Sequence, residues 1–137
     1  MWRPPRCDDT SSMRVGFVEE RGCRIVLLDF SDLDDTNAVL AQIEEARRLF
    51  LTQPPRREIL TLIDLCGMRY NDRIVRAFQE LERHDEPWER AVAVCGLSTL
   101  GRVAFRTVHV LTGNRMQMFA SRDEGVAWLL SHARVAA

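Results

Sequence analysis

The stretch that decides the fold is Ala91-Val92-Ala93-Val94-Cys95-Gly96-Leu97-Ser98, in which five apolar residues run into a glycine and a serine. A short apolar run that ends at a turn residue is typical of a strand. Ser98 is a suitable cap for a helix, which we expect to run to Gly113. A strand that leads directly into a helix is the repeating unit of a parallel α/β sheet.

The same unit recurs on both sides of this stretch. Upstream, an alternating segment from Met13 and an apolar segment that ends at Asp29 flank the turn Glu20-Arg21-Gly22, which predicts a β-hairpin. The other expected elements are a helix from Asp34–Thr36 to Pro54, a strand at 58–64, a helix from Asp72 to Pro87, a strand at 116–119 and a final helix opened by the capping box Ser121-x-x-Glu124. The order is β-β-α-β-α-β-α-β-α, which predicts a mixed, mostly parallel sheet with the hairpin as its antiparallel edge.

The length of 137 residues fits one domain with one core. The first twelve residues are rich in Pro, Asp, Ser and Thr and predict a mobile leader. We therefore expect a single domain over residues 13–137.

Composition excludes several classes of function. The net charge is −1, so the chain has no overall field that would attract nucleic acid or an anionic membrane. All 19 basic residues are arginine, which excludes lysine chemistry. The sequence contains no run of 18 apolar residues, so it predicts no membrane insertion. The four cysteines form no C-x-x-C pair, so they suggest neither a zinc site nor a thioredoxin-type site. Free thiols and the lack of a signal-peptide pattern predict a cytoplasmic protein.

No motif for catalysis is present. The segment Gly96–Val103 resembles a phosphate-binding loop, but Arg102 replaces its lysine and Val103 its magnesium-binding hydroxyl. His84, His109 and His132 lack metal-ligand spacing, and no serine stands in a G-x-S-x-G elbow. We therefore expect a protein that is not an enzyme and needs no metal or cofactor.

Four side chains are predicted at strand ends, where open α/β sheets usually bind ligands. Cys66 and Cys95 could be neighbours, which the sequence leaves open, and we favour buried, unreactive thiols over reactive ones because the sequence supplies no base. Asp29 and Asp64 could form a paired-carboxylate or magnesium site. Turn formation explains both aspartates more simply.

One helical face offers a candidate binding surface. If residues 99–112 form one helix, Arg102, Phe105, Arg106 and His109 share a face opposite an apolar stripe. The stripe consists of Leu100, Val103, Ala104, Thr107, Val108 and Leu111. Such a face is either merely solvated or a surface that binds a protein or an acidic group.

Four short segments follow one another along the chain: Leu62-Ile-Asp-Leu-Cys-Gly67, Val94-Cys-Gly-Leu-Ser-x-Leu100, Leu111-Thr-Gly-Asn-Arg-Met116 and Glu124-Gly-Val-Ala-Trp-Leu129. In this order they resemble the SpoIIAA-like proteins, whose small bacterial members share a fold with STAS domains and are related to the CRAL-TRIO lipid-binding fold. The resemblance implies a regulatory or adaptor domain that binds another protein or itself. The apolar edge of the hairpin and Phe105 among exposed arginines predict a homodimer. By analogy with CRAL-TRIO proteins, a carrier of a small apolar ligand or lipid is the alternative.

Anti-sigma-factor antagonists of the STAS kind are switched by phosphorylation of a serine in a D-S-S-G turn. The resemblance places Asp72 at the aspartate, Arg73 and Ile74 at the two serines, and Val75 at the glycine. No hydroxyl group remains at these positions, and the helical spacing of Ile74 with Phe78 predicts that Ile74 points inward. We therefore expect no phosphorylation switch here, and a helix-capping role for Asp72.

Overall fold

The computed structural model describes residues 14–112 and 115–133, so the predicted leader lies outside the described residues. One five-stranded sheet has the order β1-β2-β3-β4-β5. Its strands are β1 (Val15–Glu20), β2 (Cys23–Asp29), β3 (Ile59–Asp64), β4 (Glu89–Cys95) and β5 (Met116–Phe119). The helices are α2 (Thr36–Leu51), α3 (Asp72–Asp85), α4 (Thr99–Ala104), α5 (Arg106–Thr112) and α6 (Arg122–Ser131). Strands β1 and β2 are antiparallel and the other neighbours are parallel, which confirms the predicted topology.

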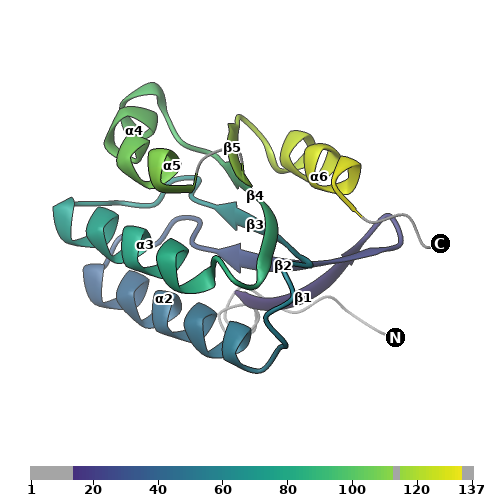
Figure 1. Cartoon of the computed structure of the whole chain (residues 1–137). Coiled ribbons are helices and arrows are strands. Elements are labelled where there is room, and N and C mark those ends of the chain that lie inside the picture. Colours follow the sequence, from purple (N-terminus) through teal and green to yellow (C-terminus); the bar gives the residue numbers. More distant parts are fainter. Residues whose placement is uncertain (1–13, 113–114, 134–137) are drawn as a thin grey trace, which may run out of the picture.

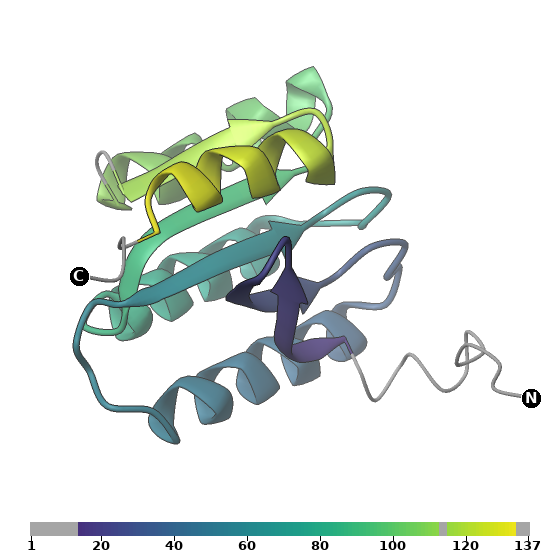
Figure 2. The ribbon, with the colours of Figure 1, turned by 90° about the vertical axis from the view of Figure 1, so that its right-hand side faces the viewer.

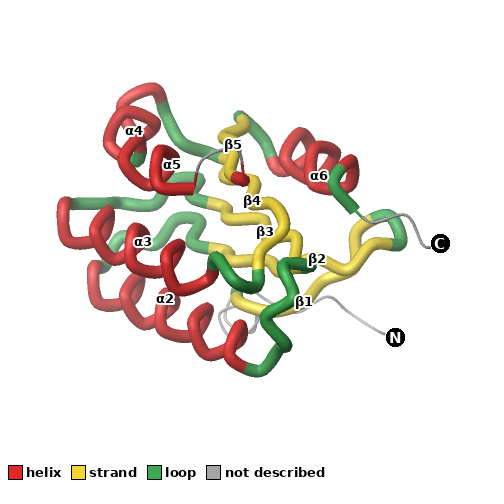
Figure 3. Tube along the Cα trace, in the orientation of Figure 1, coloured by secondary structure: helices red, strands yellow, loops and turns green. Residues whose placement is uncertain are grey.

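The helices form a layer on each face of the sheet. Helices α2, α3, α4 and α5 lie on one side and α6 on the other, as Figures 1 and 2 show. The larger core lies on the first side and includes Phe30, Phe50 and Phe78, while Val126 and Leu129 of α6 pack into a smaller core on the second. Figure 3 shows the alternation of strands and helices that produces this arrangement. Among the described residues, no helix is both long and apolar enough to span a bilayer.

The predicted hairpin is confirmed, and its turn has a simple physical basis. Arg21 and Gly22 both have positive φ, of 51° and 79°, which suits the right-handed twist of a two-residue hairpin. The register pairs Glu20 with Cys23 directly across this turn. Beyond it, the guanidinium carbon of Arg24 lies 3.7 Å from the ring centroid of Phe17, a cation–π contact between the two strands.

The third predicted helix is two helices, which corrects the expected faces. Between α4 and α5, Phe105 leaves helical geometry with φ −92° and ψ 8°. Phe105 is 3% exposed and packs edge-on against Phe78 and Tyr70, with both centroid distances 5.5 Å. The predicted inward residues Leu100 and Val103 are instead 74% and 63% exposed. The break reorients α4 relative to α5, so one helical wheel cannot describe both.

The helix caps are mostly as predicted. The backbone N–H of Glu124 donates to Ser121 Oγ at 3.3 Å in α6, and that of Gly101 donates to Ser98 Oγ at 3.1 Å in α4. The cap of α3 is Asn71, whose Oδ1 accepts from the Ile74 N–H at 2.9 Å. Asp72 is therefore the first residue of the helix, and its predicted capping role was wrong by one position.

Candidate functional site

At the carboxyl edge of the sheet, two aspartates organise the turns that follow their strands. Asp29 and Asp64 are register partners at the ends of β2 and β3. Asp29 Oδ1 accepts from the backbone N–H and hydroxyl of Ser31 at 3.0 and 2.6 Å. Asp64 Oδ1 accepts from the Cys66 N–H at 2.9 Å. These contacts confirm the interpretation that both aspartates form turns.

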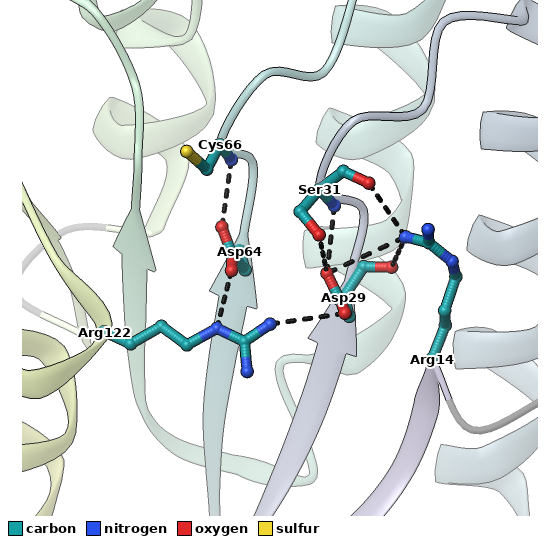
Figure 4. Close-up of polar contacts among 6 residues, drawn as sticks. All are labelled: Arg14, Asp29, Ser31, Asp64, Cys66 and Arg122. Carbon is teal, nitrogen blue, oxygen red and sulfur yellow. Dashed lines mark hydrogen bonds and ion pairs between the residues drawn. The ribbon is translucent and has the colours of Figure 1, made fainter. Parts of the chain in front are cut away.

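Two arginines neutralise these aspartates, as Figure 4 shows. Arg122, at the start of α6, donates through Nε to Asp64 Oδ2 at 2.6 Å, and its Nη2 lies 3.2 Å from Asp29 Oδ2. Arg14 donates to the carbonyl oxygens of Asp29 and Ser31 at 3.2 and 2.9 Å. Partial burial lowers the pKa of Arg122, but Asp64 and Asp29 outweigh it and raise that pKa overall. We call these four charged residues the edge network. Its two arginines balance the charges of its two aspartates, so no uncompensated carboxylate is left to bind a metal ion.

The two cysteines at this edge have different surroundings. Cys95 is buried, and burial together with the Asp64 charge raises the pKa of its thiol to about 12. Cys66 is exposed, so its predicted burial was wrong. The two residues lie on neighbouring segments, since the Leu65 N–H donates to the Cys95 carbonyl at 2.9 Å. A protonated thiol at Cys95 is a poor nucleophile, which agrees with an unreactive role.

A groove of about 500 Å³ lies between α3 and the α4–α5 pair. It is lined by Tyr70, Asn71, Asp72, Val75, Arg76, Gln79, Ala104 and Thr107. The segment aligned with the STAS switch therefore forms part of its wall. Ile74 is 1% exposed and points into the core as predicted, whereas Arg73 is exposed.

The predicted binding surface is only partly present. Arg102 and Arg106 are exposed, but Phe105 belongs to the core, and the side chain of His109 lies outside the described residues. The exposed apolar residues beside the arginines are Leu100 and Val103, which sequence reasoning had placed inside. We call Leu100, Arg102, Val103 and Arg106 the α4 surface.

An enclosed apolar cavity near Phe105 has a volume of only about 10 Å³. Its walls are Ile63, Leu65, Phe78, Glu82, Val94, Phe105, Val108, Met116 and Met118. This volume is close to the minimum for one water molecule, on the order of 10–15 Å³. A lipid or similar ligand would need the helices over the sheet to move apart.

Three buried carboxyl groups lie at the amino edge of the sheet, and sequence reasoning did not predict them. Glu82, Asp85 and Glu89 are each at most 1% exposed, and one oxygen of each lies within 4.8 Å of the others. Glu82 and Asp85 were detectable, because they share the helical spacing of the inward residues Phe78 and Leu81. We call these three residues the acid cluster; their oxygens could in principle coordinate a metal.

The acid cluster has unusual electrostatics. The nearest cation is Arg115, whose side chain is 13% exposed and lies 3.7 Å from a Glu82 oxygen and 3.8 Å from a Glu89 oxygen. Burial raises the pKa of Glu82, and it raises that of Asp85 to about 9 with help from the Glu82 charge. Burial and the neighbouring Glu82 and Asp85 charges raise the pKa of Glu89 well above its usual range.

Known proteins resemble this chain in fold. An uncharacterised protein of the DUF3478 family with a SpoIIAA-like fold, from Shewanella loihica PV-4, has a TM-score of 0.64 at 17% identity, covering 84% of this chain and 91% of that one. An anti-sigma-factor antagonist (STAS) domain protein from Planctomyces limnophilus has a TM-score of 0.53 at 14% identity, covering 87% and 97%. No family model and no curated protein matches this chain. The chain therefore has a SpoIIAA-like fold, as the sequence resemblance predicted.

Proposed function

We propose that this chain is a cytoplasmic, non-enzymatic regulatory or adaptor domain that binds a partner protein through the α4 surface and the adjoining groove. The observation that carries the proposal is the exposure of Leu100 and Val103, at 74% and 63%. They are three residues apart on one short helix, so their side chains lie on the same side of it. Adjacent exposed apolar side chains of this size are typical of a contact surface.

The charges around the α4 surface favour a particular partner chemistry. Arg102 is an exposed residue of the same helix, and Arg106 is exposed at the start of α5. Arg76 lines the groove on the α3 side. Exposed apolar residues with arginines on the same and neighbouring helices fit a partner segment that combines apolar anchors with acidic residues.

Binding is proposed to be constitutive at this surface. The switch-equivalent residues Asp72, Arg73 and Ile74 carry no hydroxyl that could accept a phosphoryl group, and the side chain of Ile74 is buried. Within Met68–Val75 the only hydroxyl belongs to Tyr70, which packs edge-on against Phe105. A phosphate mapped to this segment that changes partner affinity would contradict this part of the proposal.

The partner can be captured with the immobilised chain, identified by mass spectrometry and tested in purified form by calorimetry. The double substitution Leu100→Ser with Val103→Ser should weaken binding by at least tenfold, because it removes the apolar anchors. Leu51→Ser is the matched control, since Leu51 is also exposed, at 59%, but lies at the end of α2. Equal affinity of the double variant and the control would refute the proposed surface.

The homodimer predicted from the sequence remains a proposal. Phe105 is buried, so the ground of an exposed Phe105 among arginines does not hold, and the ground that remains is the outer side of β1, which has no neighbouring strand among the described residues. Analytical ultracentrifugation of the same variants separates the cases. Self-association that the double variant abolishes would make a second copy the occupant of the α4 surface, and self-association that it leaves intact would direct attention to β1.

A further inference from the structure

We propose that the acid cluster is a built-in proton-binding site, which holds two protons at neutral pH and, by releasing them at alkaline pH, loosens the junction between α3 and β4. The site is separate from the α4 surface. It consists of Glu82 and Asp85 in the last turn of α3 and Glu89, the first residue of β4.

The carboxyl oxygens of the acid cluster lack donors. Both oxygens of Glu82, both of Glu89 and Oδ2 of Asp85 are buried without a hydrogen-bond partner. Two ionised carboxylates cannot donate to each other, whereas one proton between Glu82 and Glu89 creates a hydrogen bond. Such a proton gives one oxygen of each glutamate a partner within the geometry that the chain already has.

The charges of the acid cluster do not balance when all three carboxyl groups are ionised. Three ionised carboxylates beside the single guanidinium of Arg115 would leave two uncompensated negative charges in a buried space. Buried, unpaired charges are costly, so each is removed by taking up a proton. Two protons neutralise the cluster.

The other groups that face the cluster do not supply the missing positive charge. On α3, His84 Nδ1 lies 2.8 Å from Asp85 Oδ1, and burial lowers the pKa of this imidazole, so at neutral pH it is uncharged. The charge of Arg47 in α2 lowers the pKa of Asp85 but does not outweigh burial, and Arg47 is itself paired with Glu44 at 3.7 Å. Glu86 is exposed and contacts Arg57 at 3.4 Å and Arg115 at 3.9 Å. The buried hydroxyl of Thr61 in β3 acts on Glu89 as a hydrogen-bonding group and lowers its pKa, but it adds no charge and does not outweigh burial.

A divalent cation is the competing occupant, and two features argue against it. The guanidinium of Arg115 already lies against Glu82 and Glu89, where it would repel a cation. All three carboxyl side chains are at most 1% exposed, which leaves no open position through which a hydrated ion would enter.

The sign of the pH dependence follows from the raised pKa values. The native state keeps protons that the unfolded chain releases above its ordinary carboxyl pKa of about 4. The stabilisation is complete below that value and is lost as pH rises toward the folded pKa, which for Asp85 is about 9. With two protons retained, the folding equilibrium constant should fall about 100-fold per pH unit between about pH 7 and 8.5.

Urea unfolding at several pH values from 7 to 8.5 tests the proposal. Glu89→Gln keeps the size of the side chain and supplies a permanent donor to Glu82, so the fall should shrink to about tenfold per pH unit. Glu80→Gln is the matched control, because Glu80 is an exposed acid of the same helix; it should keep the wild-type slope.

A wild-type slope near zero, or an unchanged slope in Glu89→Gln, would overturn the proposal. If this variant does not fold, carbonyl ¹³C NMR of the wild-type protein with labelled glutamate decides the question. Two side-chain carboxyl signals that share one proton and titrate above pH 7 would support the proposal. Spectra in which every glutamate side chain is already ionised at pH 7 would refute it. A rise in Tm with Mg²⁺, Ca²⁺, Mn²⁺ or Zn²⁺ that Glu89→Gln abolishes would assign the cluster to a cation instead.

Discussion

The two edges of the sheet hold charged groups under opposite conditions. At the carboxyl edge, the edge network matches Asp29 and Asp64 with Arg14 and Arg122, and solvent reaches part of it, since the Arg122 side chain is 44% exposed. At the amino edge, the acid cluster sets three buried carboxyls against Arg115, with the charge of Arg47 acting on Asp85 from farther away. Paired charges can remain ionised and hold a helix against the end of a strand. Buried carboxylates without enough positive charge nearby take up protons, because burying an uncompensated charge is costly.

Arg115→Ala should give the largest effect, because it removes the one guanidinium from the acid cluster. We expect a loss of about 3–5 kcal/mol in the free energy of unfolding at pH 7, with part recovered at pH 5 as the carboxyls take up a further proton. Urea unfolding at both pH values measures this. Arg83→Ala, an exposed arginine of α3, should stay within about 0.5 kcal/mol. A cost below about 1 kcal/mol for Arg115→Ala would show that the cluster does not depend on its cation.

The next effect concerns Gly96, which follows β4 and lies against Cys66 in the loop after β3. A Cβ on Gly96 would lie 2.6 Å from the Cα and N atoms of Cys66, and Gly96 has φ +87°. Gly22 also has positive φ, +79°, but a Cβ there meets nothing within 4 Å. Gly22→Ala should cost about 1–2 kcal/mol for backbone conformation alone, and Gly96→Ala about 1–3 kcal/mol more for the clash. Thermal unfolding of the two variants isolates that difference, and equal costs would mean that Cys66 moves aside freely.

Arg122→Ala tests the clamp of the edge network. It breaks the contacts of α6 with both Asp64 and Asp29, and we expect a cost of about 1–2 kcal/mol, discounted because the side chain is 44% exposed. A double-mutant cycle with Asp64→Asn measures the coupling directly. Arg48→Ala removes a more exposed pair with Glu45 at 3.4 Å and should cost less than about 0.5 kcal/mol. Coupling no larger than that of this surface pair would mean that the network does not anchor α6.

The sequence predicted the fold well because local signals agreed with tertiary packing. The apolar runs, the Arg21-Gly22 turn and the caps Ser98 and Ser121 each specify their element within a few residues. The binding surface was predicted less well. Its prediction assumed one helix over residues 99–112, and the break at Phe105 depends on an aromatic contact with Phe78, which is distant in sequence.

The charged sites show the same limit. Asp29 and Asp64 were expected at strand ends, but their pairing with Arg122 depends on where the last helix packs. The acid cluster joins the end of α3 with the start of β4 and with Arg115, which comes just before β5. The helical spacing shows that Glu82 and Asp85 lie on the inward face of α3. It does not show which residues of other segments they meet, because that depends on how the strands are arranged.

The smallest predicted effect distinguishes two neighbouring residues at the start of α3. Asn71 Oδ1 accepts the Ile74 N–H at 2.9 Å, and its Nδ2 donates to Thr36 Oγ1 at 3.0 Å, so Asn71 both caps α3 and connects it to α2. Asn71→Ala should therefore cost about 1 kcal/mol. Asp72 lies in the first turn, where its charge gains only the helix dipole. Asp72→Ala should cost about 0.3–0.5 kcal/mol and less in high salt.

Urea unfolding at low and high salt separates these contributions. The loss of a neutral hydrogen bond in Asn71→Ala should depend little on salt, whereas the Asp72→Ala cost should shrink as salt screens the charge. The reverse order would restore Asp72 as the cap and would mean that the Asn71 contacts contribute little. Because both residues line the groove beside the α4 surface, the same two variants also show whether partner binding depends on how firmly α3 begins. A weaker affinity in Asn71→Ala with Asp72→Ala unchanged would indicate that an ordered start of α3 is part of the binding surface.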